Sequence, residues 1–251
     1  MSRLSFGRHR LIWCVTVRKA EKERSSAIVL LSGGLDSTVS LALCSEYCRL
    51  KAALFFDYGQ HASLREEDAA RRTADHFKLS FERIELPWMG RLSSSVLIAG
   101  KGEPRELSPE DLDKRGRAYS LEVWVENRNA VFINIAAAYA AANKCGVVIV
   151  GFNREEAANF PDNSEEFLRR MNESLELGVG KPVRVESPTI SMTKREIAGE
   201  GLRLCVPWNL IWSCYRGGDV MCGRCESCLR LKRAVSGTPA EAEVRFGKER
   251  H

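Results

Sequence analysis

The sequence predicts an α/β protein whose mostly parallel, five-stranded sheet is covered by helices on both faces. Short apolar runs rich in β-branched residues, such as residues 28–31 and 147–150, are typical of strands that are buried on both sides. These runs alternate with longer segments of helical periodicity, the order that produces parallel βαβ units. A glycine turn joins the first apolar run directly to the first helical segment. Sheets of this kind bind ligands at the carboxyl ends of their strands.

The first third of the chain supplies three strands and two helices. Ser63 and Glu66 have the spacing of a capping box, in which two side chains satisfy free amides at a helix start. We therefore expect the second helix to begin at Ser63. The other elements expected in order are a strand over 28–31, a helix over 37–49, a strand over 52–56 and a strand over 81–86.

The later part of the chain continues the alternation after an irregular stretch. Residues 89–120 lack a clear period, and the Gly, Pro and charged residues of 101–117 predict a surface loop. Thr193 and Glu196 form a second capping-box pattern, so we expect a helix that starts there and ends before Pro207. The remaining expected elements are a short strand over 121–125, a buried helix over 129–145, a strand over 147–150, a helix over 164–177 and an extended segment over 182–188.

The composition is ordinary for a water-soluble globular protein, with 44% hydrophobic and 28% charged residues among 251. No run of about 18 apolar residues is present, so we expect no transmembrane helix and no membrane partner. The formal net charge of +5 fits anionic small molecules such as nucleotides. A charge of this size does not by itself indicate direct nucleic-acid binding, which we do not expect.

The turn after the first strand has the sequence Ser32-Gly33-Gly34-Leu35-Asp36-Ser37. A glycine pair lets backbone amides point into one concavity, where phosphates lie against the positive end of the following helix. Asp36 and Ser37 are favourable capping residues for that helix. The loop is not a Walker A motif, because no Gly-Lys-Ser/Thr follows. It resembles the pyrophosphate loop of ATP pyrophosphatases, which activate a carbonyl oxygen as an adenylate; the alternative is an ordinary glycine turn.

Four of the nine cysteines, Cys214, Cys222, Cys225 and Cys228, follow a C-x7-C-x2-C-x2-C pattern. Four thiolates at this spacing suit tetrahedral Zn²⁺ in a closed, structural site, and an iron–sulfur cluster is the alternative. The other cysteines are scattered through apolar segments, and we expect Cys145 and Cys205 in the core. This usage favours a cytoplasmic protein over a secreted disulfide framework.

These features divide the chain into four parts. Residues 1–24 are basic, have no clear period and are expected to form a flexible leader. Residues 25–205 are expected to form a nucleotide-binding α/β domain and 206–235 a small zinc-binding lobe. Residues 236–251 are left as a tail.

Several further motifs follow one another along the chain. They are residues 30–37, Asp57-Tyr58-Gly59-Gln60, Arg128-Asn129, Phe160-Pro161-Asp162, Ser187-Pro188, and Trp212-Ser213-Cys214-Tyr215 followed by Cys222-Gly223-x-Cys225-x-x-Cys228. Over about residues 27–233 this order resembles that of the 7-cyano-7-deazaguanine synthases. Those enzymes convert 7-carboxy-7-deazaguanine, ammonia and ATP into the nitrile of queuosine and archaeosine synthesis, through adenylated acid and amide intermediates. They have an adenine nucleotide α-hydrolase-like, Rossmann-like fold, carry zinc and usually form homodimers.

The resemblance implies one site for the acid and for ATP with Mg²⁺. The expected catalytic residues are Ser32, Asp36, Ser37, Arg128 and Lys194. The expected cofactor-binding residues are Leu30, Leu31, Ser32, Gly33, Gly34, Leu35, Asp36, Ser37, Thr38, Asp57, Tyr58, Gln60, Arg128, Asn129, Asn153 and Asp162. The expected structural zinc ligands are Cys214, Cys222, Cys225 and Cys228.

Residue chemistry gives some of these side chains a specific expected role. The guanidinium of Arg128 makes paired bonds to phosphate or carboxylate, with a surface ion pair as the alternative. A carboxylate at Asp162 matches the adjacent N–H and amino donors of a guanine-like edge, although Asp in such a turn is also common structurally. Lys194 opens a helix, where a cation gains nothing from the dipole, so we expect it to face a ligand. Asp36 either caps its helix or helps to hold Mg²⁺.

Other functions remain open on the sequence. Where the family commonly has Pro-Gly or Pro-Ala before Arg-Asn, this chain has Glu126-Asn127. A diverged relative would transfer the activated acyl group to a protein amine or stop at the amide. A tRNA sulfur transferase would share the phosphate loop. A non-enzymatic zinc module would bind nucleic acid through the basic residues Arg224, Arg230, Lys232 and Arg233.

Overall fold

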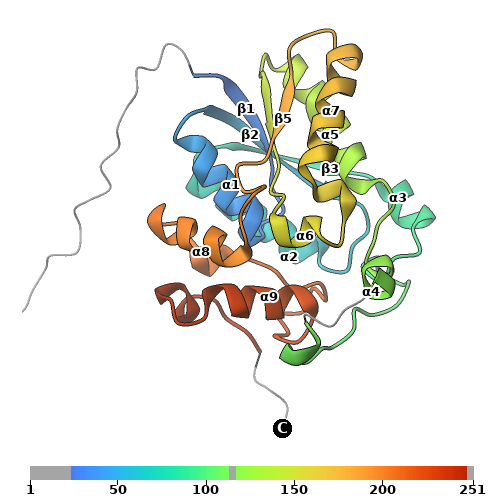
Figure 1. Ribbon diagram of the computed structural model, residues 1–251, viewed down its shortest axis with the longest axis vertical. Helices are drawn as coiled ribbons and strands as arrows, with labels where there is room; N and C mark the ends of the chain where they lie inside the picture. The colour runs from blue at the N-terminus through green and yellow to red at the C-terminus, as the bar shows by residue number, and fades with distance from the viewer. Residues whose placement is uncertain (1–23, 113–116, 248–251) are drawn as a thin grey trace, which may run out of the picture.

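The computed structural model describes residues 24–112 and 117–247, which build a parallel sheet between layers of helices (Figure 1). The sheet has the strand order β3-β2-β1-β4-β5, and every neighbouring pair is parallel. The predicted mostly parallel, five-stranded sheet is therefore confirmed. The expected leader falls almost wholly on residues 1–23, outside the described residues. The strands are β1 Ser26–Leu30, β2 Arg49–Asp57, β3 Ser80–Glu85, β4 Val147–Ile149 and β5 Arg184–Glu186.

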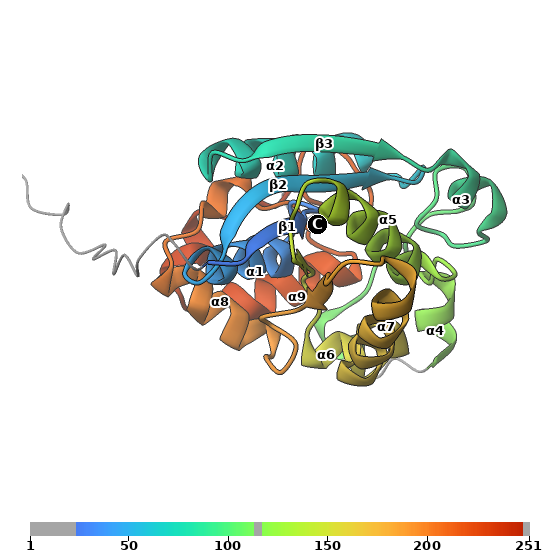
Figure 2. The ribbon, with the colours of Figure 1, turned by 90° about the horizontal axis from the view of Figure 1, so that it is seen from above.

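The helices pack on both faces of the sheet, as the alternation of elements predicts (Figure 2). The α-helices are α1 Leu35–Ser45, α2 Ser63–His76, α3 Pro87–Leu92, α4 Arg117–Glu122, α5 Arg128–Ala142, α6 Arg154–Ala157, α7 Glu165–Gly178, α8 Lys194–Arg203 and α9 Glu226–Val235. Four 3₁₀ turns are η1 Pro109–Asp111, η2 Pro161–Asn163, η3 Trp208–Leu210 and η4 Pro239–Ala242. None of the helices in the described ranges is long and apolar enough to cross a membrane.

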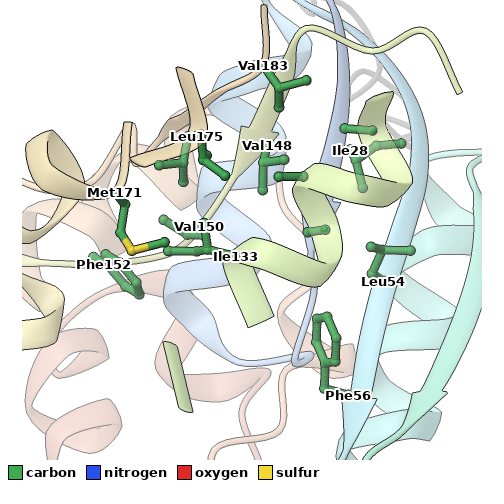
Figure 3. Close-up of a cluster of buried hydrophobic side chains, with 14 of the residues drawn as sticks. Ile28, Leu54, Phe56, Ile133, Val148, Val150, Phe152, Met171, Leu175 and Val183 are labelled. Atoms are coloured by element: carbon green, nitrogen blue, oxygen red, sulfur yellow. The ribbon is translucent and has the colours of Figure 1, made fainter. Parts of the chain in front are cut away.

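Successive residues of β1 face opposite helical layers, because side chains alternate across a strand. Ile28 packs on the face covered by α5 and α7, in one buried cluster with Ile133 and Leu175 (Figure 3). Val29 belongs to the cluster on the other face, together with Leu41 of α1. All of these side chains are almost fully buried. Both faces of the central strand therefore need apolar residues, which explains its unbroken apolar run.

A third layer of helices packs against the side of α1 that faces away from the sheet. Val39 of α1, Ile197 of α8 and Leu231 of α9 share one buried cluster with three of the clustered cysteines, Cys214, Cys225 and Cys228. α8 contacts both α1 and α9, and the two C-terminal helices lie below α1 in Figure 1. The cysteine-bearing segment is thus joined to the α/β domain by apolar packing. The boundary expected at residue 205 stays a prediction.

Most predicted elements are found within a few residues, but four local predictions are wrong. Residues 121–125 form the end of α4 and a turn, where Val123 and Val125 are buried without strand pairing. α2 has no side-chain cap, because its N-cap is Ala62 and Ser63 is already the first helical residue; Glu66 accepts from Gln60 instead of completing a capping box. Cys205 is exposed, since the chain leaves α8 there in a left-handed conformation with φ 54°. The first helix ends at Ser45, and residue 49 already belongs to β2. In contrast, the Thr193–Glu196 capping box of α8 is confirmed.

Gly151 allows the segment after β4 to lie directly against the first turn of α1. A Cβ at this position would be 2.7 Å from the backbone nitrogen of Ser37 and 2.8 Å from the carbonyl carbon of Asp36. Both distances are shorter than van der Waals contact, and both atoms belong to backbone that cannot move alone. The close approach of β4 and α1 therefore requires glycine at residue 151.

Replacing Gly151 by alanine is expected to lower the free energy of unfolding by about 1–3 kcal/mol, because the methyl group overpacks this contact. Urea unfolding measures the change. Gly199→Ala is the matched control: Gly199 lies within α8 with no atom near its Cβ position, so alanine there should stabilise by about 0.5–1 kcal/mol. Equal effects of the two substitutions would contradict the close contact.

Candidate active site

One cavity of about 290 Å³ lies at the carboxyl ends of β1, β2 and β4. From the central strand β1, the chain adds β2 and β3 on one side of the sheet and then β4 and β5 on the other. Ligands of open α/β sheets bind at the point where the direction of strand addition reverses. The cavity is lined by the loop before α1, the start of α5, the η2 segment, the first residue of α8 and the segment of residues 212–231, which carries the clustered cysteines. Of the expected site residues, those lining it are Leu30, Leu31, Ser32, Gly34, Leu35, Asp36, Ser37, Tyr58, Gln60, Arg128, Asn129, Asp162 and Lys194.

Hydrogen bonds of its two serines stabilise the conformation of the loop before α1. The hydroxyls of Ser32 and Ser37 are 3.1 Å apart, and Ser37 also donates to the carbonyl oxygen of Gly34 at 3.2 Å. Gly34, not Asp36 or Ser37, is the residue that caps the helix, and it does so without a side-chain bond. Gly33 has φ 75°, a conformation that favours glycine. The start of α1 thus faces the cavity with free amides and a positive helix end.

Lys194, which is buried, joins two partly buried carboxylates at one end of the cavity. Its Nζ lies 2.5 Å from Asp36 Oδ2 and 2.8 Å from Glu156 Oε1. Burial works against its charge, yet the two carboxylates hold the pKa of Lys194 above its ordinary value. Burial raises the pKa of Asp36 although Lys194 opposes the shift. Partial burial works to raise the pKa of Glu156, whose side chain is 31% exposed, but Lys194 lowers it below the ordinary value. The group carries one net negative charge when all three residues are ionised.

Asp36 keeps one oxygen available for a ligand. Its Oδ1 atom is buried and has no hydrogen-bond partner among the described residues. A buried orphan carboxylate oxygen is costly unless a cation or donor joins it. An oxygen atom beside a phosphate-binding loop is the type of ligand that Mg²⁺ prefers. The donor chemistry therefore fits a Mg²⁺ ion that arrives with a nucleotide.

Arg128 presents a cation at the start of α5 that no carboxylate neutralises. Its Nη1 lies 3.3 Å from the hydroxyl of Tyr58, and its guanidinium lies 5.8 Å from the centre of that ring. No ion pair within 4 Å is found for it in the part of the chain that the structure describes. Burial opposes its charge, but Tyr58 and Asp162 hold the pKa of Arg128 above its ordinary value. The guanidinium is therefore charged and available to an anionic ligand.

Asp162 lies on the η2 segment opposite the start of α5. Asn129 fixes this segment by donating from Nδ2 to the carbonyl oxygen of Asp162 at 3.2 Å. Burial raises the pKa of the Asp162 carboxyl above its ordinary value, and Arg128 opposes that shift. The structure thus brings Arg128, Asn129 and Asp162 to one wall, as the sequence predicts.

Four expected cofactor-binding residues do not line the cavity. Gly33 and Thr38 support the loop from behind, and Thr38 is fully buried. Asn153 caps α6 by accepting from the amide of Glu156 at 2.9 Å. Asp57 bonds to the amide of Gly59 and pairs with Arg83 at 2.5 Å, away from the cavity lining. A motif position at a strand end is therefore not enough to place a side chain in the site.

The structure also adds cavity residues that the sequence reasoning missed. Glu66 was missed because its spacing from Ser63 indicated a helix start. Glu156 was missed because it lies in a short polar stretch. Phe132 stacks on Phe56 with ring centres 4.1 Å apart and helps to form an aromatic wall. The periodicity of α5 could have shown that Phe132 lies one turn after Arg128. Further lining residues are Trp124, Phe160, Tyr215, Glu226 and Arg230.

The four clustered cysteines meet around one point beside this cavity. Their sulfur atoms all lie within 4.8 Å of one another, a spacing that fits four thiolates around one tetrahedral Zn²⁺. Backbone amides of Cys222, Arg224 and Cys225 donate to the cluster sulfurs at 3.2–3.4 Å. Such bonds stabilise negative charge on sulfur. The geometry fits a bound metal ion.

Comparison with known proteins places this geometry in a family. A model described as queuosine biosynthesis protein QueC matches residues 26–238. The chain belongs to the QueC family. It is 48% identical over 219 residues to the 7-cyano-7-deazaguanine synthase of Pelotomaculum thermopropionicum, covering 86% of this chain and 99% of that protein. It is 46% identical over 210 residues to that of Methanothermobacter thermautotrophicus, covering 83% and 93%. The resemblance predicted from the motifs is therefore confirmed.

Among solved structures, the chain is similar to the U34-tRNA thiolase NcsA from Methanococcus maripaludis. The TM-score is 0.47 at 17% sequence identity, and the match covers 74% of this chain and 59% of that chain.

In this QueC-family chain, the cysteine segment is bonded directly to the phosphate-binding loop. The amide of Trp212 donates to the carbonyl oxygen of Gly33 at 2.9 Å, and the Trp212 ring nitrogen donates to the carbonyl oxygen of Cys214 at 2.9 Å. Cys214 is one of the four clustered cysteines. Trp212 therefore connects the metal-type site to the turn at the start of α1. Loss of the metal would release one support of that turn.

Replacing Lys194 by methionine is expected to cost about 3–5 kcal/mol of stability at neutral pH, because two partly buried carboxylates lose their cation. Urea unfolding measures the cost, and the exposed Lys181→Met should stay within about 0.5 kcal/mol of the wild type. Since the folded pKa of Lys194 is raised, its contribution should persist up to the ordinary lysine pKa of 10.5 and be lost as the pH rises through the folded value. A cost below about 1 kcal/mol would contradict a buried, coupled group.

Stripping the metal with a chelator, or replacing Cys222 by serine, is expected to lower the melting temperature. It should also speed amide hydrogen exchange in residues 32–37, because Trp212 would no longer hold Gly33. Mass-spectrometric hydrogen exchange measures this effect. The exposed Cys205→Ser should change neither quantity. Unchanged exchange in the loop after metal loss would show that the two sites are independent.

Proposed function

We propose that this chain is a 7-cyano-7-deazaguanine synthase, an ATP-dependent ligase that converts 7-carboxy-7-deazaguanine and ammonia into the nitrile. The observation that supports it most strongly is that one cavity of this QueC-family chain brings the expected groups together. At one end lies a phosphate loop stabilised by its own serine hydroxyls. The wall formed by α5 and η2 carries the partly buried carboxylate of Asp162 and the guanidinium of Arg128, which has no ion pair among the described residues. These groups match a triphosphate at the loop and a base-borne acid at the wall.

The first step makes the carboxylate reactive. One carboxylate oxygen attacks the α-phosphorus of ATP, the bond to pyrophosphate breaks, and an acyl adenylate forms. Pyrophosphate leaves into the loop of Ser32, Gly34 and Ser37, where amide and hydroxyl donors and the positive end of α1 stabilise its charge. Mg²⁺ held in part by Asp36 Oδ1 would neutralise the same phosphates.

Arg128 is proposed to hold the acid or the α-phosphate by paired hydrogen bonds. The guanidinium has no competing carboxylate, and the positive end of α5 adds to its field. Asp162 is proposed to accept from the adjacent ring N–H and amino group of the deazaguanine. The flat base would lie against the aromatic wall that contains Phe132 and Phe160.

The second half of the reaction uses the same site again. Ammonia attacks the acyl carbon, AMP leaves, and the amide forms. The amide oxygen then attacks the α-phosphorus of a second ATP, and the bond to pyrophosphate breaks. Loss of AMP and of both N–H protons of the amide leaves the nitrile. Because both activations release pyrophosphate, a single loop serves both.

The altered residues before Arg128 do not favour a different acceptor. Asn127 caps α5 with φ 57°, the left-handed conformation in which glycine is common. Asparagine tolerates this conformation because its short polar side chain bonds locally. The chain therefore keeps the backbone path of a Gly-Arg-Asn turn with a different sequence. Transfer to a protein amine and arrest at the amide remain the alternatives.

We further propose Zn²⁺ as the ion of the cysteine cluster, a cytoplasmic location and a homodimeric assembly. Four sulfur ligands close the coordination shell, so Zn²⁺ there supplies a structural crosslink and no open position for chemistry. No disulfide joins the cysteines that lie within the described ranges, which suits a reducing compartment. The homodimer rests on the family resemblance.

Incubation of the purified protein with 7-carboxy-7-deazaguanine, ATP, Mg²⁺ and ammonium is expected to yield the nitrile, two AMP and two pyrophosphate per product. Mass spectrometry identifies the product, and Ser32→Ala should slow its formation because the loop loses a donor. Accumulation of the amide alone would favour the arrested alternative. Absence of both products from a folded, metal-loaded sample would reject the proposal.

A further inference from the structure

Glu66 is a cavity carboxylate with no ion pair in the part of the chain that the structure describes, and the site described above gives it no role. It lines the cavity from the first turn of α2. Its Oε2 accepts a hydrogen bond from Gln60 at 3.0 Å, whereas Oε1 has no bonding partner in the described ranges. The capping-box pattern predicted that this side chain would turn back to the backbone of its own helix. It points to the cavity instead.

Gln60 fixes the orientation of Glu66. Its side-chain oxygen accepts from the amide of Tyr58 at 2.9 Å, and its side-chain nitrogen donates to the carbonyl of Phe56 at 3.1 Å as well as to Glu66. All hydrogens of this amide are thus used, and Gln60 is almost fully buried. Gln60 is a positioning residue that aims one carboxylate oxygen at a defined place.

That place is next to the phosphate loop. A Cβ on Gly33 would lie 2.6 Å from the Cβ of Ala69, so α2 and the loop are in direct contact there. Ala69 is three residues after Glu66, and residues three apart share one face of a helix. Arg128 lines the same cavity and acts electrostatically on Glu66. Glu66 therefore shares the cavity with the loop that receives pyrophosphate and with the group proposed to hold the acid.

The other cavity carboxylates have partners or another proposed ligand. Asp36 and Glu156 pair with Lys194, and Glu226 pairs with Arg230 at 3.0 Å. Asp162 faces the proposed base. Burial raises the pKa of Glu66 above its ordinary value, with Gln60 and Arg128 opposing and Asp57 adding to the shift. A carboxylate in such surroundings is a stronger proton acceptor than an exposed one.

We propose that Glu66 binds the ammonium ion and takes its first proton. This inference rests on the proposed function, since it assigns the nucleophile's site in the same cavity. Ammonia is mostly protonated at neutral pH, and an ammonium ion has no lone pair for attack. A carboxylate recognises the ion by charge-assisted hydrogen bonds. One N–H bond breaks and its proton moves to Glu66 Oε1, which leaves neutral ammonia beside the acyl adenylate.

The remaining steps balance without another reactant. The nitrogen lone pair forms a bond to the acyl carbon, and the carbon–oxygen bond to AMP breaks. The second nitrogen proton leaves with the AMP phosphate, and Glu66 returns its own proton to solvent through the open cavity. The same carboxylate is placed to receive the protons that are lost when the amide becomes the nitrile.

The test compares the wild type with Glu66→Gln, which keeps an acceptor for Gln60 and nearly the same shape. At neutral pH we expect the KM for ammonium to rise or kcat to fall, with a combined loss in kcat/KM on the order of 100-fold. KM for ATP and for the acid should stay unchanged. The loss should shrink as the pH rises and free ammonia becomes abundant. Asp68→Asn, an exposed change on the same helix, is the matched control and should behave as wild type.

Hydroxylamine gives an independent readout, because it is unprotonated at neutral pH and needs no base to become a nucleophile. Hydroxamate should form at equal rates with the wild type and Glu66→Gln. A general structural defect would slow both nucleophiles, and thermal melting checks the fold of each variant.

The outcomes separate this inference from the proposed function. Nitrile made with equal ammonium kinetics by both proteins would overturn the role of Glu66 and leave the synthase activity standing. A raised KM for ATP or for the acid, with ammonium kinetics unchanged, would also overturn it and make Glu66 a ligand for that substrate. Amide without nitrile from the wild type would reject the synthase alone, since the ammonium step would still be measurable as amide.

Discussion

The site depends on the close packing of backbone around the turn between β1 and α1. Gly33 lies against α2, Gly151 brings the segment after β4 against α1, and Trp212 donates to the carbonyl oxygen of Gly33. These three contacts come from distant parts of the sequence. Each acts on the backbone, so the shape of the turn does not rely on flexible side chains. A phosphate-binding loop held in this way needs little reorganisation when charge develops on the leaving group.

The distribution of charged side chains in the cavity favours binding of an anionic ligand. Lys194 is already balanced by Asp36 and Glu156, whereas Arg128 has no carboxylate within ion-pair distance in the described ranges. Two helix starts add positive potential at the same walls. A buried, unpaired guanidinium is costly in the free protein. Binding of a phosphate or carboxylate group offsets that cost, which ties substrate binding to the stability of the cavity wall.

Local sequence patterns were sufficient for the sheet, the turn and the cysteine cluster. Runs of apolar residues, a glycine pair and cysteine spacing each reflect physics within a few residues, and they predicted β1, α1 and the metal-type site well. The sequence could not show that Asp57 turns away to Arg83 or that Glu66 turns toward Gln60. Those choices depend on which partner is nearer in the folded chain. The same limit explains residues 121–125, where alternating burial comes from a turn over the cavity.

Under the proposed mechanism, the positions of the charged groups also allow one cavity to perform two activations in succession. The amide formed in the first half has lost the negative charge that Arg128 would hold, so this cation becomes free to contact the phosphates of the second ATP. The flat base can keep its position through both activations. The groups proposed to hold it, Asp162 and the aromatic wall, do not contact the carbon whose charge changes. Glu66 and the turn at Gly33 flank the same space throughout. Repeated use of one loop therefore follows from fixing the base and exchanging only the nucleotide.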